Sequence, residues 1–131
     1  MQRIFYRVGG KLLNQPTKTS ILQVVSTKQL DICLLTDKNE IHRFKFDNNV
    51  FYKDEKEALL VGINLGLMIS KGKSQYSVNI ETPDYDVVKL LSNRTNKIDD
   101  LTQYYMNVIN LTIDKMDWVG IRELGYNMNL D

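Results

Sequence analysis

The stretch DEKEALLVGINLGL at positions 54–67 separates an extended half of the sequence from a helical half. Asp54 followed three residues later by Glu57 has the spacing of a capping box, which marks the start of a helix. Leucine and isoleucine then recur at the helical period, and Gly72 marks the expected end. The two glycines inside the quoted stretch, four positions apart, indicate that the helix backbone lies close against a sheet or another helix.

Four segments before this helix are rich in Ile, Val, Phe and Tyr, and turn-forming residues follow each of them. They predict antiparallel strands joined by short turns, at Arg3–Gly9, Ser20–Thr27, Leu30–Thr36 and Ile41–Phe46. In the last segment, aromatic residues such as Phe44 alternate with basic residues such as Arg43. This alternation predicts an inward aromatic face and a basic face toward solvent.

The residues after the helix predict a strand, two helices and a last strand. Tyr76–Glu81 alternates as a strand, and Thr82 fits a helix N-cap with Pro83 at the first position of a short helix that ends at about Leu91. Apolar residues at spacings of three and four predict a longer helix carrying Ile98, Leu101, Tyr105, Val108 and Leu111. Trp118–Glu123 is the last expected strand.

The chain has the length of one domain, and we expect a single domain over residues 1–131. Seventeen basic and sixteen acidic side chains leave a net charge of +1, which gives little of the long-range field that drives non-specific nucleic-acid binding. The single cysteine, Cys33, lies between two apolar residues, and we expect a buried thiol in a cytoplasmic protein. The longest apolar run, Ala58–Ile69, is too short to cross a bilayer, so we expect no membrane partner.

Residues 55–131 resemble the ribonuclease H family in three segments. Glu55–Gly66 is similar to the family helix E-Y-x-A-L-I-x-G-L-x-x-A in its acid, its Ala-Leu pair and its glycine. Val78–Val88 resembles a family strand that ends in D-S before a helix with V-V, and Gly120–Asn129 resembles the closing V-P-R-E-x-N-x-x-A-D through its Arg-Glu pair. The resemblance implies a ribonuclease H-like α/β fold, a mixed sheet in which antiparallel N-terminal strands precede helix-strand-helix-helix-strand.

The same resemblance implies that most of the family's catalytic acids are absent. Glu55 would be the counterpart of the catalytic glutamate, but Pro83 stands at the position of an aspartate, and Asn129 stands at the closing aspartate. The first family acid should lie on the opening strand. Depending on which strand that is, its position falls near residues 6–7 or near Ser26, and none of these residues is acidic.

The family's chemistry is phosphodiester hydrolysis assisted by two magnesium ions, which need several converging carboxylates. We therefore predict a pseudoenzyme, a noncatalytic domain that uses no cofactor and acts through a partner. The alternative is a divalent-metal-dependent nuclease in which displaced acids, Glu81 or Asp84 and Asp131, rebuild a magnesium site with Glu55. Side-chain direction argues against it, because a shift of one residue along a strand or helix points the carboxylate elsewhere.

Two classes of partner stay open at this level. Structured nucleic acid would be contacted by basic residues near helix starts and loops, namely Lys71, Lys73, Lys89, Arg94 and Lys97. A protein partner would instead dock on the sheet or on a helical surface that carries Tyr104, Tyr105 and Tyr126. His42, the one histidine, follows the apolar alternation of its strand and is expected to be a core or edge imidazole. The composition suits a phage or mobile-element accessory protein.

Overall fold

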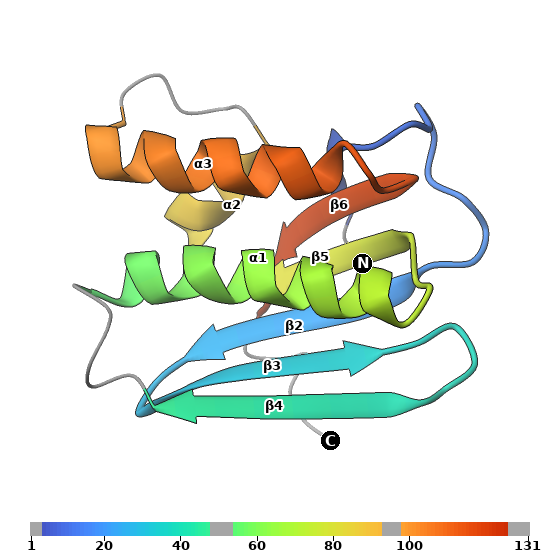
Figure 1. Ribbon diagram of the computed structural model, residues 1–131, viewed down its shortest axis with the longest axis horizontal. Coiled ribbons are helices and arrows are strands. Elements are labelled where there is room, and N and C mark those ends of the chain that lie inside the picture. The colour runs from blue at the N-terminus through green and yellow to red at the C-terminus, as the bar shows by residue number, and fades with distance from the viewer. Residues whose placement is uncertain (1–3, 48–53, 93–97, 126–131) are drawn as a thin grey trace.

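The computed structural model describes residues 4–47, 54–92 and 98–125. In chain order the elements are β1 (Tyr6–Gly9), β2 (Ser20–Ser26), β3 (Gln29–Leu35), β4 (Ile41–Asp47), α1 (Glu55–Gly72), β5 (Ser77–Thr82), α2 (Tyr85–Leu91), α3 (Asp100–Ile113) and β6 (Trp118–Glu123) (Figure 1). This is the predicted order. No helix within the described ranges combines the length and the apolar character that crossing a bilayer requires.

The strands form one mixed sheet in the order β1-β6-β5-β2-β3-β4. β5 runs parallel to both β2 and β6, whereas the β2–β3, β3–β4 and β1–β6 pairs are antiparallel. The predicted fold class, an α/β fold with a mixed sheet, is therefore confirmed. β1 pairs with β6 at one edge of the sheet and not with β2. The antiparallel strands that precede α1 are therefore β2, β3 and β4, and β2 is the first of them. The expected position of the first family acid is then the one near Ser26, which is buried.

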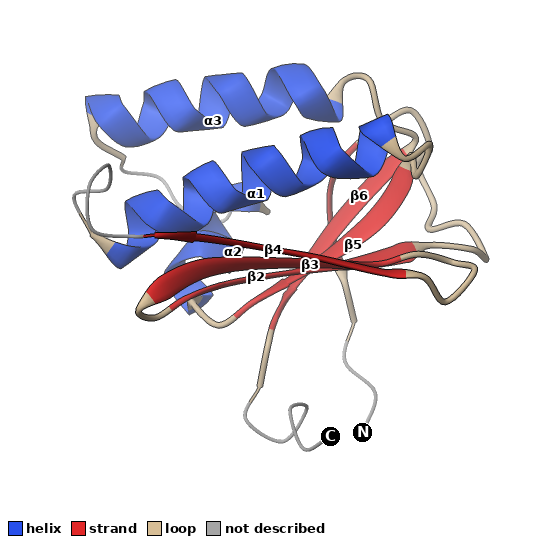
Figure 2. Cartoon of the chain, turned by 60° about the horizontal axis from the view of Figure 1, so that its bottom comes forward, coloured by secondary structure: helices blue, strands red, loops and turns tan. Residues whose placement is uncertain are grey.

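The hydrophobic core lies between the sheet and the helices, and α1 and α3 lie side by side over one face of the sheet (Figure 2). Leu22 and Val24 of β2 are fully buried beneath α1. A Cβ atom added at Gly66 would lie 2.8 Å from both methyl carbons of Leu22, and one added at Gly62 would lie 2.7 Å from Cγ1 of Val24. The close approach predicted from the two helix glycines is therefore confirmed.

The start of α2 differs from the prediction. Thr82 is the last residue of β5, where it pairs with Glu123 of β6, so its backbone belongs to the sheet and not to a helix cap. Asp84 is the N-cap instead, and its Oδ1 accepts hydrogen bonds from the backbone N–H groups of Asp86 at 2.8 Å and Val87 at 3.3 Å. The helix begins at Tyr85, and Pro83 lies in the turn that joins it to β5.

The buried face of α3 also differs from the prediction. Met106, Ile109 and Ile113 face the core, while Leu101 and Leu111 are 41% and 67% exposed. The spacing of apolar residues correctly predicted a helix. It did not predict the buried side of that helix, because α3 has more apolar residues than its contact with α1 can cover.

Candidate functional site

The face of the sheet opposite α1 carries a row of side chains, which we call the cross-sheet row and define as Arg122, Glu81, Gln23, Cys33 and Arg43. One residue comes from each of β6, β5, β2, β3 and β4, and each is the direct cross-strand neighbour of the next. Because side chains alternate along a strand, all five lie on the face away from α1. Cys33 is accordingly only partly buried, which corrects its predicted burial, since its two apolar neighbours take the positions toward the helix.

Glu81 and Arg122 form the best-connected part of the row. Oε2 of Glu81 accepts hydrogen bonds from Nε of Arg122 at 2.8 Å and from Nη2 at 2.5 Å, and Oε1 accepts from Nε2 of Gln23 at 2.9 Å. The guanidinium carbon also lies 4.1 Å from the centroid of the Phe5 ring. The two charged side chains are only 5% and 15% exposed. Both carboxylate oxygens of Glu81 are thus hydrogen-bonded, and its charge is neutralised within the protein.

A hollow of about 240 Å³ lies beside the row and is partly lined by it. Pro83 and Leu124 give it apolar walls, and Asp31 and Arg43 line it together, with Oδ1 of Asp31 3.6 Å from Nε of Arg43. Pro83 is the residue at which the family resemblance places an aspartate. The hollow therefore pairs one acid with one base and has no carboxylate at the position that the resemblance makes central.

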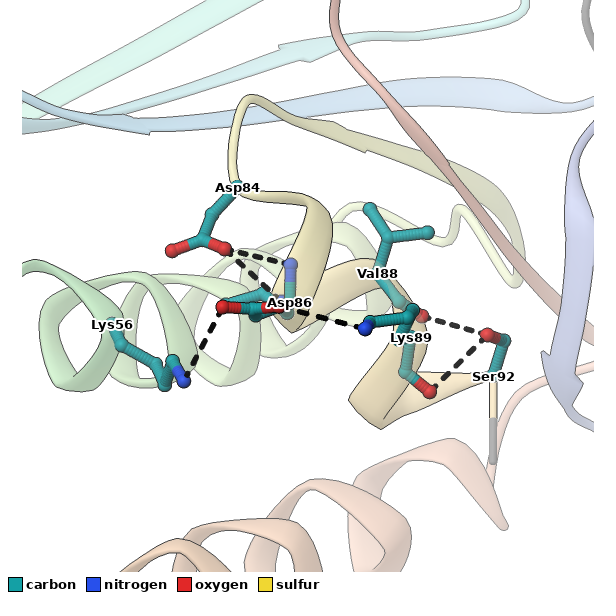
Figure 3. A network of polar contacts seen from close by, with 7 residues as sticks. Lys56, Asp84, Asp86, Val88, Lys89 and Ser92 are labelled. Atoms are coloured by element: carbon teal, nitrogen blue, oxygen red, sulfur yellow. Dashed lines mark hydrogen bonds and ion pairs between the residues drawn. The ribbon is translucent and has the colours of Figure 1, made fainter. Parts of the chain in front are cut away.

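Each described acid that the alternative nuclease hypothesis would use has a different local setting. Glu55 is exposed in the first turn of α1, Glu81 is bound to Arg122, and Asp84 caps α2 (Figure 3). Asp131 lies outside the described residues, as does Asn129. Across residues 4–47, 54–92 and 98–125, no three Asp, Glu, His or Cys side chains are grouped so that they could hold a metal ion together.

Lys89 lies in a mixed-charge network on α2 (Figure 3). Its Nζ is 3.7 Å from Oδ1 of Asp86 and 5.2 Å from the centroid of the Tyr85 ring. Lys56 of α1 reaches the other oxygen of Asp86 at 3.9 Å. These lysines line a hollow of about 370 Å³ whose wall also includes acids such as Asp99. The acids reduce the positive potential that a phosphate would meet here.

The other basic residues proposed for nucleic acid do not join this network. Lys71 lies in the last turn of α1 and Lys73 follows its end, whereas the contacts to Asp86 come from its first turn. A helix of 18 residues is about 27 Å long at a rise of ~1.5 Å per residue. Arg94 and Lys97 lie outside the described residues. Lys71 and Lys73 therefore lie at the far end of α1 from Lys56, the residue that shares Asp86 with Lys89.

The tyrosines proposed for a protein surface have different surroundings. Tyr105 is partly buried against the core and its hydroxyl donates a hydrogen bond to Oε1 of Glu57 at 2.8 Å, which ties α3 to α1. Tyr104 is 61% exposed and its ring meets that of Tyr105 edge-on, with the centroids 5.7 Å apart. Tyr126 lies outside the described residues. Tyr104 is available as a surface anchor, whereas Tyr105 serves the packing of two helices.

Sequence patterns do not predict the cross-sheet row as a unit. They mark Arg122 only as part of the Arg-Glu pair in the segment that resembles the family's closing motif, and they do not distinguish Gln23. A signal was present, because Glu81 and Arg122 are charged residues that directly follow apolar strand positions, Ile80 and Ile121, and a buried charge needs a partner. The sequence does not say which two such residues meet, because that depends on strand order.

Comparisons with known proteins support the fold. No protein-family model matches the chain, and no curated protein sequence does. Among solved structures, the chain is similar to the N-terminal RNase H domain of Rv2228c from Mycobacterium tuberculosis, solved as a fusion protein with maltose-binding protein. The TM-score is 0.62 over 86% of each chain, with 10% sequence identity. At this identity the likeness shows a ribonuclease H-like fold, and it supports the resemblance seen in residues 55–131 to that extent.

Proposed function

We propose that this chain is a noncatalytic binding domain with a ribonuclease H-like fold, which acts through a protein partner and does not cut nucleic acid. The Glu81–Arg122 pair is the observation that carries the proposal. Glu81 is the most buried carboxylate on the face of the sheet opposite α1. Its Oε2 lies 2.5 Å from Nη2 of Arg122, and its Oε1 accepts a hydrogen bond from the Gln23 amide. A metal ion would have to displace both.

Metal-assisted hydrolysis makes demands that these acids meet poorly. Magnesium binds oxygen ligands in near-octahedral geometry, and two-metal hydrolysis needs carboxylates that converge on both ions. Recruiting Glu81 would break its ion pair with Arg122, and recruiting Asp84 would remove the cap of α2. Glu55 is then left as a first-turn acid, a position that the positive end of the helix dipole favours without any catalytic role.

The distribution of positive charge favours a protein over a nucleic acid as the partner. A surface that binds nucleic acid gathers Lys and Arg where they can contact successive phosphates. Here Lys71 and Lys73 lie at one end of α1, Lys89 faces Asp86 near the other end, and the net charge is only +1. The face of the sheet opposite α1 carries the cross-sheet row and a hollow of about 240 Å³ with both polar and apolar lining residues.

We expect the purified chain to leave RNA·DNA hybrid, double-stranded and single-stranded substrates intact in the presence of Mg²⁺ or Mn²⁺. A gel-based cleavage assay checks this, with Glu55→Gln as the matched variant, since the substitution removes the one acid that the resemblance keeps in place. Wild type and variant should be equally inactive. Metal-dependent cleavage by the wild type that Glu55→Gln abolishes would overturn the noncatalytic assignment.

The same samples decide the class of partner by gel shift. We expect no retention of hybrid or duplex at moderate salt, because Lys71 and Lys73 lie at the C-terminal end of α1, whereas Lys89 faces Asp86, which Lys56 reaches from the first turn of α1. A shifted band that disappears with added salt and with Lys89→Ala would assign the partner to nucleic acid. That result would not contradict the noncatalytic assignment, because the gel shift measures binding and the cleavage assay measures hydrolysis.

A further inference from the structure

Strand β4 is one outer edge of the sheet. Among the described residues it pairs with β3 alone, over seven residues and without a register shift. The opposite edge, β1, has only four residues and a register shift between Arg7 and Gly9, which is the irregularity that commonly blunts an edge. The sheet therefore has one short, irregular edge and one long, regular edge.

The backbone groups on the outer side of β4 follow from its pairing. At the turn into β4, the N–H of Thr36 donates to the C=O of Glu40 at 2.9 Å, so this pair is hydrogen-bonded. Bonded and non-bonded pairs alternate along an antiparallel ladder, which turns the N–H and C=O groups of His42 and Phe44 toward β3. The corresponding groups of Arg43 and Lys45 point outward, where a further strand would meet them.

The side chains of β4 divide by face. His42, Phe44 and Phe46 lie on the same side of the sheet as α1, opposite buried residues of β3. The Phe46 side is still accessible, since this residue is 39% exposed. Arg43 and Lys45 lie on the face of the sheet opposite α1, and the Arg43 side chain is 57% exposed. An added strand would place alternate side chains against these two faces. Apolar residues fit beside the phenylalanines, and acidic residues fit beside the two cations.

Pairing of β4 with a second copy of this chain is unfavourable in the register centred on Phe44. Antiparallel self-pairing centred on Phe44 would set Arg43 of each copy directly opposite Lys45 of the other. Like charges directly opposite one another destabilise a strand pair, and basic residues on an edge are a common protection against self-association. The same two cations attract an extended segment that carries acids two residues apart. In that register the edge favours a different chain over a second copy.

We propose that β4 docks an extended segment of a partner protein, which adds to the sheet as a strand and alternates apolar with acidic residues. This inference rests on the proposed binding function and names its surface and the chemistry of its partner. The backbone groups of Arg43 and Lys45 supply hydrogen bonds of the kind used in strand addition, and the two charged side chains select the sequence.

A blocked peptide, Thr-Val-Glu-Val-Glu-Val-Thr, is the probe. We expect its addition at about 1 mM, a concentration that detects weak binding, to protect the backbone amides of Arg43 and Lys45 from hydrogen exchange. The amides of His42 and Phe44 are already bonded to β3 and should exchange slowly with or without peptide. Absence of protection at Arg43 and Lys45, or protection confined to other strands, would overturn the proposal.

Charge reversal gives a second readout. Arg43→Glu combined with Lys45→Glu turns two attractive cross-strand pairs into repulsive ones, and we expect about a tenfold loss of affinity for the glutamate peptide. The variant should instead bind the peptide in which lysine replaces both glutamates. Lys38→Glu, in the exposed turn before β4, is the matched control and should leave binding unchanged. Equal binding of the glutamate peptide by wild type and double variant would contradict the proposal.

The two proposals fail in different ways. Metal-dependent cleavage of nucleic acid would overturn the noncatalytic function on which the edge-strand inference rests. Absence of peptide binding without any cleavage would overturn the inference about β4 alone, and the binding surface would then have to lie elsewhere on the domain.

Discussion

Replacing Arg122 with methionine is expected to lower the free energy of unfolding by about 3–5 kcal/mol, as when one partner of a buried ion pair is removed. The substitution leaves the carboxylate of Glu81, which is 5% exposed, with the Gln23 amide but without its cation. Methionine keeps part of the apolar stem but also removes the guanidinium that lies over the Phe5 ring, so the loss combines the ion pair with this cation–π contact. Urea denaturation followed by circular dichroism measures it.

Two further variants separate burial from charge. Arg43→Met removes another cation of the cross-sheet row, but this side chain is 57% exposed, and its pair with Asp31 at 3.6 Å should contribute less than about 1 kcal/mol. Adding Glu81→Met to Arg122→Met removes the uncompensated charge and should restore most of the lost stability. Equal losses in the free energy of unfolding for Arg122→Met and Arg43→Met would contradict a larger contribution from the buried Glu81–Arg122 pair.

Replacing Leu22 with alanine should lower the free energy of unfolding by about 2–5 kcal/mol, the usual range for a fully buried leucine. Leu22 lies on the central strand β2 beneath α1, where the helix approaches at Gly66. The loss combines the transfer free energy of the removed methyl and methine groups with the cost of a cavity that the helix backbone does not move to fill. The urea midpoint of unfolding, with an unchanged slope, checks this effect.

Gly66→Ala tests the same contact from the helix side. In the wild type its Cβ would lie 2.8 Å from Leu22, so the leucine has to move. In the Leu22→Ala background that space is free, and alanine should recover about 1 kcal/mol of helix propensity. Gly72→Ala is the matched control, because its Cβ meets no atom within 4 Å. Gly66→Ala having the same effect in both backgrounds would contradict the close approach.

Much of the fold could be predicted from local patterns. Asp54 accepts the N–H of Glu57 at 2.9 Å as the capping pattern requires, and β6 has the predicted bounds Trp118–Glu123. Local patterns failed where long-range pairing decided the outcome. Thr82 has the chemistry of a helix cap, but pairing with β6 keeps it in the sheet, and Asp84 takes the role.

The candidate site was much less predictable than the fold. The cross-sheet row depends on the registers of five strands at once, and a shift of one residue in any of them turns that strand's side chains to the other face. Glu81 and Arg122 are 41 residues apart in sequence, and only the parallel pairing of β5 with β6 brings them together. Charged residues beside the apolar positions of β5 and β6 indicated that partners must exist, but not which ones.

The most direct test of the noncatalytic assignment is a titration of the protein with Mn²⁺, followed by electron paramagnetic resonance of the free hexaaquo ion. Because Glu81 is held by Arg122 and Gln23, and Asp84 by the start of α2, we expect the free-ion signal to rise with added Mn²⁺ as it does in buffer. Loss of that signal at a stoichiometry near one or two ions per chain, reversed by Glu55→Gln or Glu81→Gln, would show a carboxylate metal site and contradict the assignment.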